Sequence, residues 1–239
     1  MGQALNRVAK PHPETHVAPK IALRDIVIGL SDGLTVPFAL AAGVSVAVAS
    51  TRVVVTAGLA EIVAGSISMG LGGYLAARTD VERYVSERRR EYREVELVPH
   101  IERDEVRDVF REYGLAGPEL ERVVEHIVAD PDRWVDFMMR FELGLERPQT
   151  YHAPVSALTI AVSYALGGLV PLIPYVLIRD MRGALWLSCG LTLLALFLFG
   201  GYKARMTRTP RLRGAIQTTL IGAAAAAAAF VIARLVSGA

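Results

Sequence analysis

Five stretches of about 20 consecutive, mostly apolar residues constrain this chain more than any other feature of its sequence. They cover residues 25–49, 53–77, 153–178, 183–202 and 214–233. A helix of about 20 residues crosses the hydrocarbon core of a bilayer, and a helix also satisfies the backbone amides that would be costly to leave unpaired in lipid. We therefore predict an all-α integral membrane protein with five transmembrane helices.

The segment between the second and third stretches has a different composition. Residues 78–147 contain 19 Asp and Glu against 13 Lys and Arg, although the whole chain has a formal net charge of +2. Its first part continues the second stretch without a Gly or Pro, and further Gly and Pro residues then divide the segment. The pattern predicts helices at 78–96, 102–113, 118–129 and 132–145.

The predicted organisation has four parts. Residues 1–20 lack the apolar core of a signal peptide, so we expect the first apolar stretch to be retained. We predict that these residues form a disordered cytosolic leader. Residues 21–77 hold transmembrane helices 1 and 2, residues 78–150 form an inserted helical domain, and residues 151–239 hold transmembrane helices 3 to 5.

The positive charges near the transmembrane stretches predict their orientation. Nine Lys and Arg precede the first stretch or lie between the fourth and fifth, and four lie on the opposite side. Because cytosolic loops carry an excess of positive charge, we expect the N-terminus and the acidic insert in the cytosol. The C-terminus is then outside or luminal. The membrane is either vacuolar or a bacterial plasma membrane.

Two carboxylates inside the apolar stretches are candidates for an ion pathway. Asp32 is followed by Gly33 and Pro37, which can loosen a helix, and Glu61 precedes Met69 by two helical turns. A charged side chain in a bilayer is costly and is retained mainly where it lines a path or pairs. A carboxylate without a counter-charge holds a proton until a cation displaces it, which suggests exchange of a metal cation for protons.

The acidic insert has a second group of candidate ligands. Carboxylates with thioethers favour first-row transition metals over Ca²⁺ or Mg²⁺. An ordinary solvated face is the alternative for the glutamates, since arginines interleave with them, and core packing is the alternative for the methionines. The candidates, at helical spacing, are Glu87, Glu91, Glu94, Glu102, Glu105, Met138, Met139 and Glu142.

Several motifs are absent from the sequence. It has no phosphate-binding loop for ATP, no His-Glu-x-x-His and no Glu-x-x-His of di-iron bundles. We therefore predict that the protein is not an enzyme and has no permanently bound cofactor. The membrane, divalent metal ions and protons are its expected partners, and nucleic acid is not.

Four segments resemble the vacuolar iron transporter family, in the form that has a cytosolic metal-binding domain. They read DIVIGLSDGLTVPFAL from residue 25, AEIVAGSISMGLGGYLA from 60, DFMMRFELGLE from 136 and GGLVPLIPY from 167. The resemblance extends from about residue 22 to the C-terminus. It implies a homodimer with an ion path between the subunits, and proton-driven export of Fe²⁺ from the cytosol.

The resemblance also assigns residues to roles. Its ion pathway falls on Asp32, Glu61 and Met69. It leaves Glu87 outside the metal site, and its cytosolic metal ligands fall on Glu91, Glu94, Glu102, Glu105, Met138, Met139 and Glu142.

Two functions remain open at this point. The first is a secondary transporter that moves Fe²⁺ out of the cytosol in exchange for protons, with Mn²⁺, Co²⁺ and Zn²⁺ as further candidate substrates. The second is a membrane-anchored metal sensor or buffer without vectorial transport.

Overall fold

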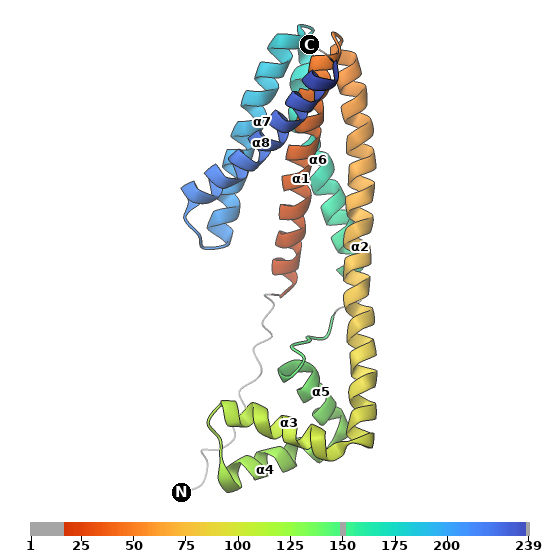
Figure 1. Ribbon diagram of the computed structural model, residues 1–239, viewed down its shortest axis with the longest axis vertical. Coiled ribbons are helices and arrows are strands. Elements are labelled where there is room, and N and C mark those ends of the chain that lie inside the picture. The colour runs from red at the N-terminus through yellow and green to blue at the C-terminus, as the bar shows by residue number, and fades with distance from the viewer. Residues whose placement is uncertain (1–16, 149–151, 238–239) are drawn as a thin grey trace, which may run out of the picture. The chain divides into compact units, whose positions relative to one another are not determined.

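The computed structural model describes residues 17–148 and 152–237, which form α-helices and no strand (Figure 1). This confirms the predicted all-α class. The described residues fall into two compact units, a membrane unit up to Gly73 and from Pro154 onward, and an acidic unit, Tyr74–Ala153. The helices are α1 (Val17–Ala47), α2 (Thr51–Leu97), α3 (Pro99–Glu112), α4 (Gly117–Val128), α5 (Pro131–Phe141), α6 (His152–Leu177), α7 (Met181–Met206) and α8 (Arg211–Ser237).

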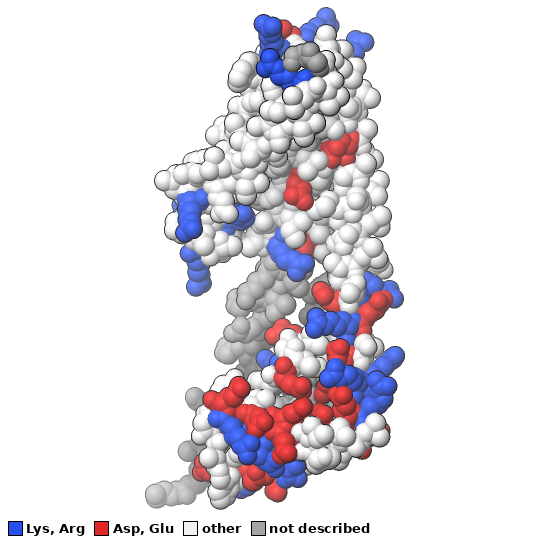
Figure 2. Space-filling model, in the orientation of Figure 1, with Lys and Arg blue, Asp and Glu red and all other residues white. Residues whose placement is uncertain are grey.

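Five of the described helices are long and apolar enough to cross a membrane, namely α1, α2, α6, α7 and α8. The most apolar windows of these helices have mean hydropathies from 1.6 to 2.0. Large uncharged areas cover their surface in the space-filling view, whereas charged side chains crowd the acidic unit (Figure 2). The chain is thus an integral membrane protein, as predicted.

Short connections join α1 to α2, α6 to α7 and α7 to α8. The Asp180 side chain begins α7, because its carboxylate accepts a hydrogen bond of 2.6 Å from the backbone amide of Gly183. At the other end of the membrane unit, α1 begins at Val17, so the last four residues of the predicted leader are helical. The rest of that leader lies outside the described residues. Helix α1 also continues through Gly33 and Pro37. Because Pro37 has no amide hydrogen, the carbonyl of Gly33 lacks its usual donor within the helix.

Helix α6 packs closely against both α1 and α2 because glycines remove side chains from the contacts. A Cβ atom added at Gly33 of α1 would lie 2.8 Å from the Cα of Tyr164, which is closer than real Cβ contacts. On α2, a Cβ at Gly58 would collide with the side chain of Leu172. These contacts bring the backbones of three helices together around the middle of α6.

The core of the membrane unit is built from four helices. The buried residues Ala41, Val54, Ile62, Leu172, Tyr175 and Ala184 form one cluster from α1, α2, α6 and α7. Helix α8 packs on α1 and α7.

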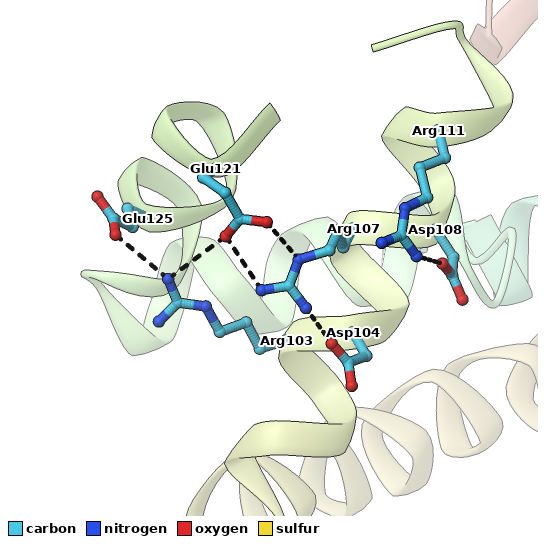
Figure 3. A network of polar contacts seen from close by, with 7 residues as sticks. All are labelled: Arg103, Asp104, Arg107, Asp108, Arg111, Glu121 and Glu125. Carbon is cyan, nitrogen blue, oxygen red and sulfur yellow. Dashed lines mark hydrogen bonds and ion pairs between the residues drawn. The ribbon is translucent and has the colours of Figure 1, made fainter. Parts of the chain in front are cut away.

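In the acidic unit, the end of α2 and helices α3 to α5 enclose a separate core. Its buried residues are Val106, Leu120, Val124, Ile127, Trp134 and Met138. Ion pairs tie α3 to α4, and the strongest is a two-pronged contact from Arg107 to Glu121 at 2.7 and 3.1 Å (Figure 3).

The last helix of the acidic unit is shorter than the sequence suggested. Helix α5 ends at Phe141 rather than near residue 145. Gly144 adopts a positive φ of 62°, and the amides of Leu143 and Leu145 donate to the carbonyls of Met138 and Met139. These hydrogen bonds close the helix and leave Glu142 at its C-terminal cap.

Candidate metal centre

Three glutamates from three different helices converge in the acidic unit. Glu91 comes from the last turns of α2, Glu102 from the first turn of α3, and Glu142 from the C-terminal cap of α5. One carboxylate oxygen from each lies within 4.8 Å of the other two. This separation is close enough for a single cation to contact all three carboxylates.

The two most buried carboxylates of this group lack hydrogen-bond partners. The exposed fraction is 1% for Glu91 and 4% for Glu102. Both oxygens of Glu91 and Oε2 of Glu102 make no hydrogen bond with any described residue. A buried, unpaired carboxylate is unfavourable unless it is protonated or binds a cation. The arrangement therefore favours cation binding over a structural role.

The electrostatics of the centre lead to the same expectation. Burial, followed by the negative charges of Glu142 and Glu94, raises the pKa of Glu91 to about 7. Burial, followed by the charges of Glu105 and Glu91, raises the pKa of Glu102 to about 7 as well. Both groups thus exchange protons near neutral pH, where a metal ion can compete with the proton.

Two further predicted ligands act on the same centre. The charge of Glu94 contributes to the raised pKa of Glu91, Glu105 and Glu142. Burial is the main cause of the raised pKa of Glu105. Arg90 is the main counter-charge here, because it pairs with Glu94 at 3.0 Å and with Glu87 at 3.2 Å. Glu87 thus shares an arginine with Glu94 and is not one of the three converging carboxylates.

The two methionines of the predicted ligand set are buried, with exposed fractions of 0% for Met138 and 1% for Met139. Met138 packs in the hydrophobic core of the acidic unit together with Trp134 and Val106. This is the core role that the sequence left open as an alternative. A ligand role for either thioether stays a prediction.

In the membrane unit, Glu61 on α2 is held by a residue of α6. The hydroxyl of Tyr164 donates a hydrogen bond to Oε1 of Glu61, and Oε2 is buried without a partner among the described residues. The absence of a side chain at Gly65 leaves room for the Tyr164 ring, since a Cβ there would collide with it. Glu61 thus offers one free oxygen inside the membrane unit.

Asp32 and Met69 lie close in sequence to helix contacts with α6. Asp32 is half-buried and precedes Gly33, which packs against the backbone of Tyr164. Met69 is half-buried and precedes Gly70, whose added Cβ would lie 3.0 Å from the carbonyl oxygen of Ala157. Both thus belong to the same three-helix group as Glu61.

Two residues of this region were not among the predicted site residues. Tyr164 is the hydrogen-bond donor to Glu61, and its place near the middle of an apolar stretch was the available signal, since membrane tyrosines concentrate at the interfaces. Asp25 directly follows Arg24 in the sequence, which is equally compatible with an ion pair and with a functional role. The structure buries Asp25 to 2% exposure, and its Oδ1 has no partner among the described residues.

Comparisons with known proteins find relatives that match nearly the whole length of the chain. The chain is 51% identical to "Vacuolar iron transporter 1" of Oryza sativa subsp. japonica over 94% of its own length and 89% of that protein. It is 51% identical to the Arabidopsis thaliana protein of the same name, over 94% and 90% of the two chains. It is 38% identical to "Vacuolar iron transporter cccA" of Arthroderma benhamiae, over 92% and 81%.

These relatives are named as transporters, in line with the prediction that the chain is not an enzyme. The family match covers both the five apolar helices and the acidic unit, from residue 23 to residue 234. The chain therefore belongs to the VIT family.

Proposed function

We propose that this protein exports Fe²⁺ from the cytosol in exchange for protons, and that its acidic unit first captures the metal. The observation that carries the proposal is the convergence of Glu91, Glu102 and Glu142, two of them buried without partners. Iron is the proposed substrate because the relatives are named iron transporters. Mn²⁺, Co²⁺ and Zn²⁺ suit the same ligands and are further candidate substrates.

Capture begins with a cluster of carboxyl groups that would repel one another if they were all ionised. Without a cation, Glu91 and Glu102 hold protons up to about neutral pH, because burial and neighbouring glutamates raise their pKa. A divalent cation replaces those protons and removes the repulsion. Glu94 and Glu105 border the centre and would complete the oxygen ligands, with Met138 or Met139 as a soft ligand that favours transition metals.

The acidic unit is proposed to face the cytosol, where it would meet exchangeable Fe²⁺. The support is the excess of Lys and Arg before α1 and between α7 and α8. In this orientation the C-terminus is outside or luminal. Metal released by the acidic unit then enters the membrane from the side on which it was collected.

Within the membrane, Asp32, Glu61 and Met69 form the proposed path. Glu61 has one oxygen fixed by Tyr164 and one oxygen without a partner, so it can bind a cation or a proton on the free side. No Lys or Arg lies between residues 25 and 51 or between 53 and 77 to neutralise these carboxylates. A carboxylate in that setting exchanges a proton for a cation, which couples the two fluxes.

The path is proposed to lie between two copies of the chain. The support is a row of exposed apolar residues at four-residue spacing on α2, formed by Val63, Ile67, Leu71 and Leu75. Such a row covers one face of the helix that carries Glu61. A second copy against this face would enclose the pathway and exclude lipid from it.

The testing experiment is Fe²⁺ uptake into proteoliposomes under an imposed pH gradient. The native chain should accumulate Fe²⁺ above the external concentration only when the interior is more acidic than the outside. Asp32→Asn and Glu61→Gln should abolish uptake, and Glu91→Gln should weaken metal capture. Glu87→Gln is the matched control, since Glu87 is on the same helix as Glu91 but is not one of the three converging carboxylates.

The second candidate function is a membrane-anchored metal sensor or buffer. It is favoured by the fact that the three converging glutamates all belong to the acidic unit and could bind a cation without any transport. Metal binding that is lost in Glu91→Gln, together with no gradient-dependent uptake by the native chain, would support this candidate and reject transport.

A further inference from the structure

A basic cavity lies on the acidic unit, apart from the three converging glutamates. Its volume is about 310 Å³, within the usual range for small-ligand sites. Arg88 and Arg89 of α2 line it together with Arg147, and the rings of Tyr84 and Tyr92 form part of its wall. No Asp or Glu is among its lining residues. We propose that this cavity binds a phosphate-bearing anion.

The arginines have hydrogen-bond donors available for such an anion. Arg89 and Arg147 make no ion pair with any residue that the structure describes. Arg88 donates from Nη2 to Tyr92 at 3.2 Å and to Asp136 at 3.3 Å, while its Nε is buried without a partner among the described residues. Three arginines therefore line one cavity, and Asp136 is their only carboxylate partner among the described residues.

The nearby acids do not cancel this positive charge. Asp136 pairs with Arg88, and its side chain is 63% exposed. Asp132 accepts a hydrogen bond from the Tyr92 hydroxyl. Both carboxylates lie beyond the lining residues, so the cavity itself presents guanidinium groups. Phosphate oxygens match the planar fork of donors on arginine better than they match a single ammonium.

The position of the cavity on α2 leaves two sources for the phosphate, a lipid headgroup and a soluble anion. The apolar stretch of α2 ends near Ala77, and the lining residues Val81 and Arg89 follow four and twelve residues later. At 1.5 Å per residue the cavity extends from about 6 to about 18 Å beyond that end, so its Val81 end is within a headgroup layer about 5–8 Å deep, whereas its arginines lie further out. Arginines next to a transmembrane helix are typical of anionic lipid binding.

The cavity also has an apolar side that suits a lipid. Val81 and Val85 line it one helical turn apart, and Pro148 adds a further apolar surface. A free phosphate ion would leave these side chains without a role. The glycerol and first acyl carbons of a phospholipid would cover them while the phosphate contacts the arginines.

The test is native mass spectrometry of the full chain in detergent, with three separate probes. These are dioctanoyl phosphatidic acid, dioctanoyl phosphatidylcholine and inorganic phosphate. The variant Arg89→Gln/Arg147→Gln removes two cations of the cavity that make no ion pair with a described residue. Arg83→Gln/Arg93→Gln is the matched control, because it removes the same charge from exposed positions of α2 that do not line the cavity. An unchanged circular dichroism spectrum and melting temperature confirm that each variant is folded.

We expect phosphatidic acid to bind the native chain and the control, and to bind the cavity variant at least about tenfold more weakly. Phosphatidylcholine, which has no net charge, should bind less tightly than phosphatidic acid. Inorganic phosphate that binds as tightly and shows the same loss would keep the site but assign it to soluble phosphate. Equal weakening in both variants, or no loss in the cavity variant, would overturn the proposal.

Discussion

The metal affinity of the acidic unit should depend steeply on pH, because Glu91 and Glu102 must lose protons before they bind a cation. The pKa of each is about 7, so at about pH 6 each is ionised in about one molecule of eleven. Both are ionised together in about one of 120. At about pH 8 both are ionised in about four of five. The apparent affinity should therefore rise about 100-fold over this range.

The assay is anaerobic equilibrium dialysis of Fe²⁺ against the full chain in detergent, from about pH 6 to about pH 8. Glu91→Gln removes one of the two titrating groups and should reduce both the affinity and the rise, to about tenfold. Glu87→Gln should behave like the native chain, since Glu87 pairs with Arg90. A native affinity that changes less than about threefold over this range would refute the reasoning.

Four further predictions follow from the structure. The metal-free chain should become less stable in thermal melts as the pH rises from about 4.5 to about 7, because the folded state holds protons on Glu91 and Glu102 that the unfolded state has already lost. The loss of folding free energy is up to about 3 kcal/mol per group. Added Fe²⁺ should restore the melting temperature. Tyr164→Phe should lower Fe²⁺ uptake about tenfold at unchanged expression, because Glu61 loses its hydrogen-bond donor. The control Tyr175→Phe removes a hydroxyl that is hydrogen-bonded to Ser45 and should leave uptake near native. Gly33→Ala should destabilise the protein by about 1–3 kcal/mol, since its Cβ would meet the backbone of Tyr164. The control Gly190→Ala places a Cβ where nothing lies within 4 Å and should leave the melting temperature unchanged. Ile67→Cys in a Cys189→Ala background should form a disulfide-linked dimer on mild oxidation. A denaturing, non-reducing gel that shows monomer and no dimer would count against the proposed homodimer.

Much of the fold could be predicted because membrane helices are dictated by length and polarity. A run of about 20 apolar residues has few alternatives, and the structure confirms five such helices. The continuation of α2 out of its apolar stretch was also predictable, since no Gly or Pro interrupts it before Pro99. The end of α5 was not, because it depends on Gly144 adopting a positive φ.

The metal centre was much harder to predict from residue spacing. Glu87, Glu91 and Glu94 have equivalent positions on one helical stripe, yet Glu91 is buried and Glu87 pairs with Arg90. Which of them is buried depends on where α3 and α5 pack, and helical periodicity does not contain that information. The family resemblance made the distinction. Tyr164 was missed because its partner, Glu61, is 103 residues away in the sequence.

The most direct test of the central claim is to follow protons while Fe²⁺ moves. Proteoliposomes with a trapped pH dye and no initial pH gradient would receive external Fe²⁺. If the chain exchanges Fe²⁺ for protons, the interior should become more alkaline as Fe²⁺ enters, and both signals should vanish together in Asp32→Asn. Fe²⁺ entry without any change of internal pH would contradict proton exchange, and the absence of both signals in the native chain would contradict transport.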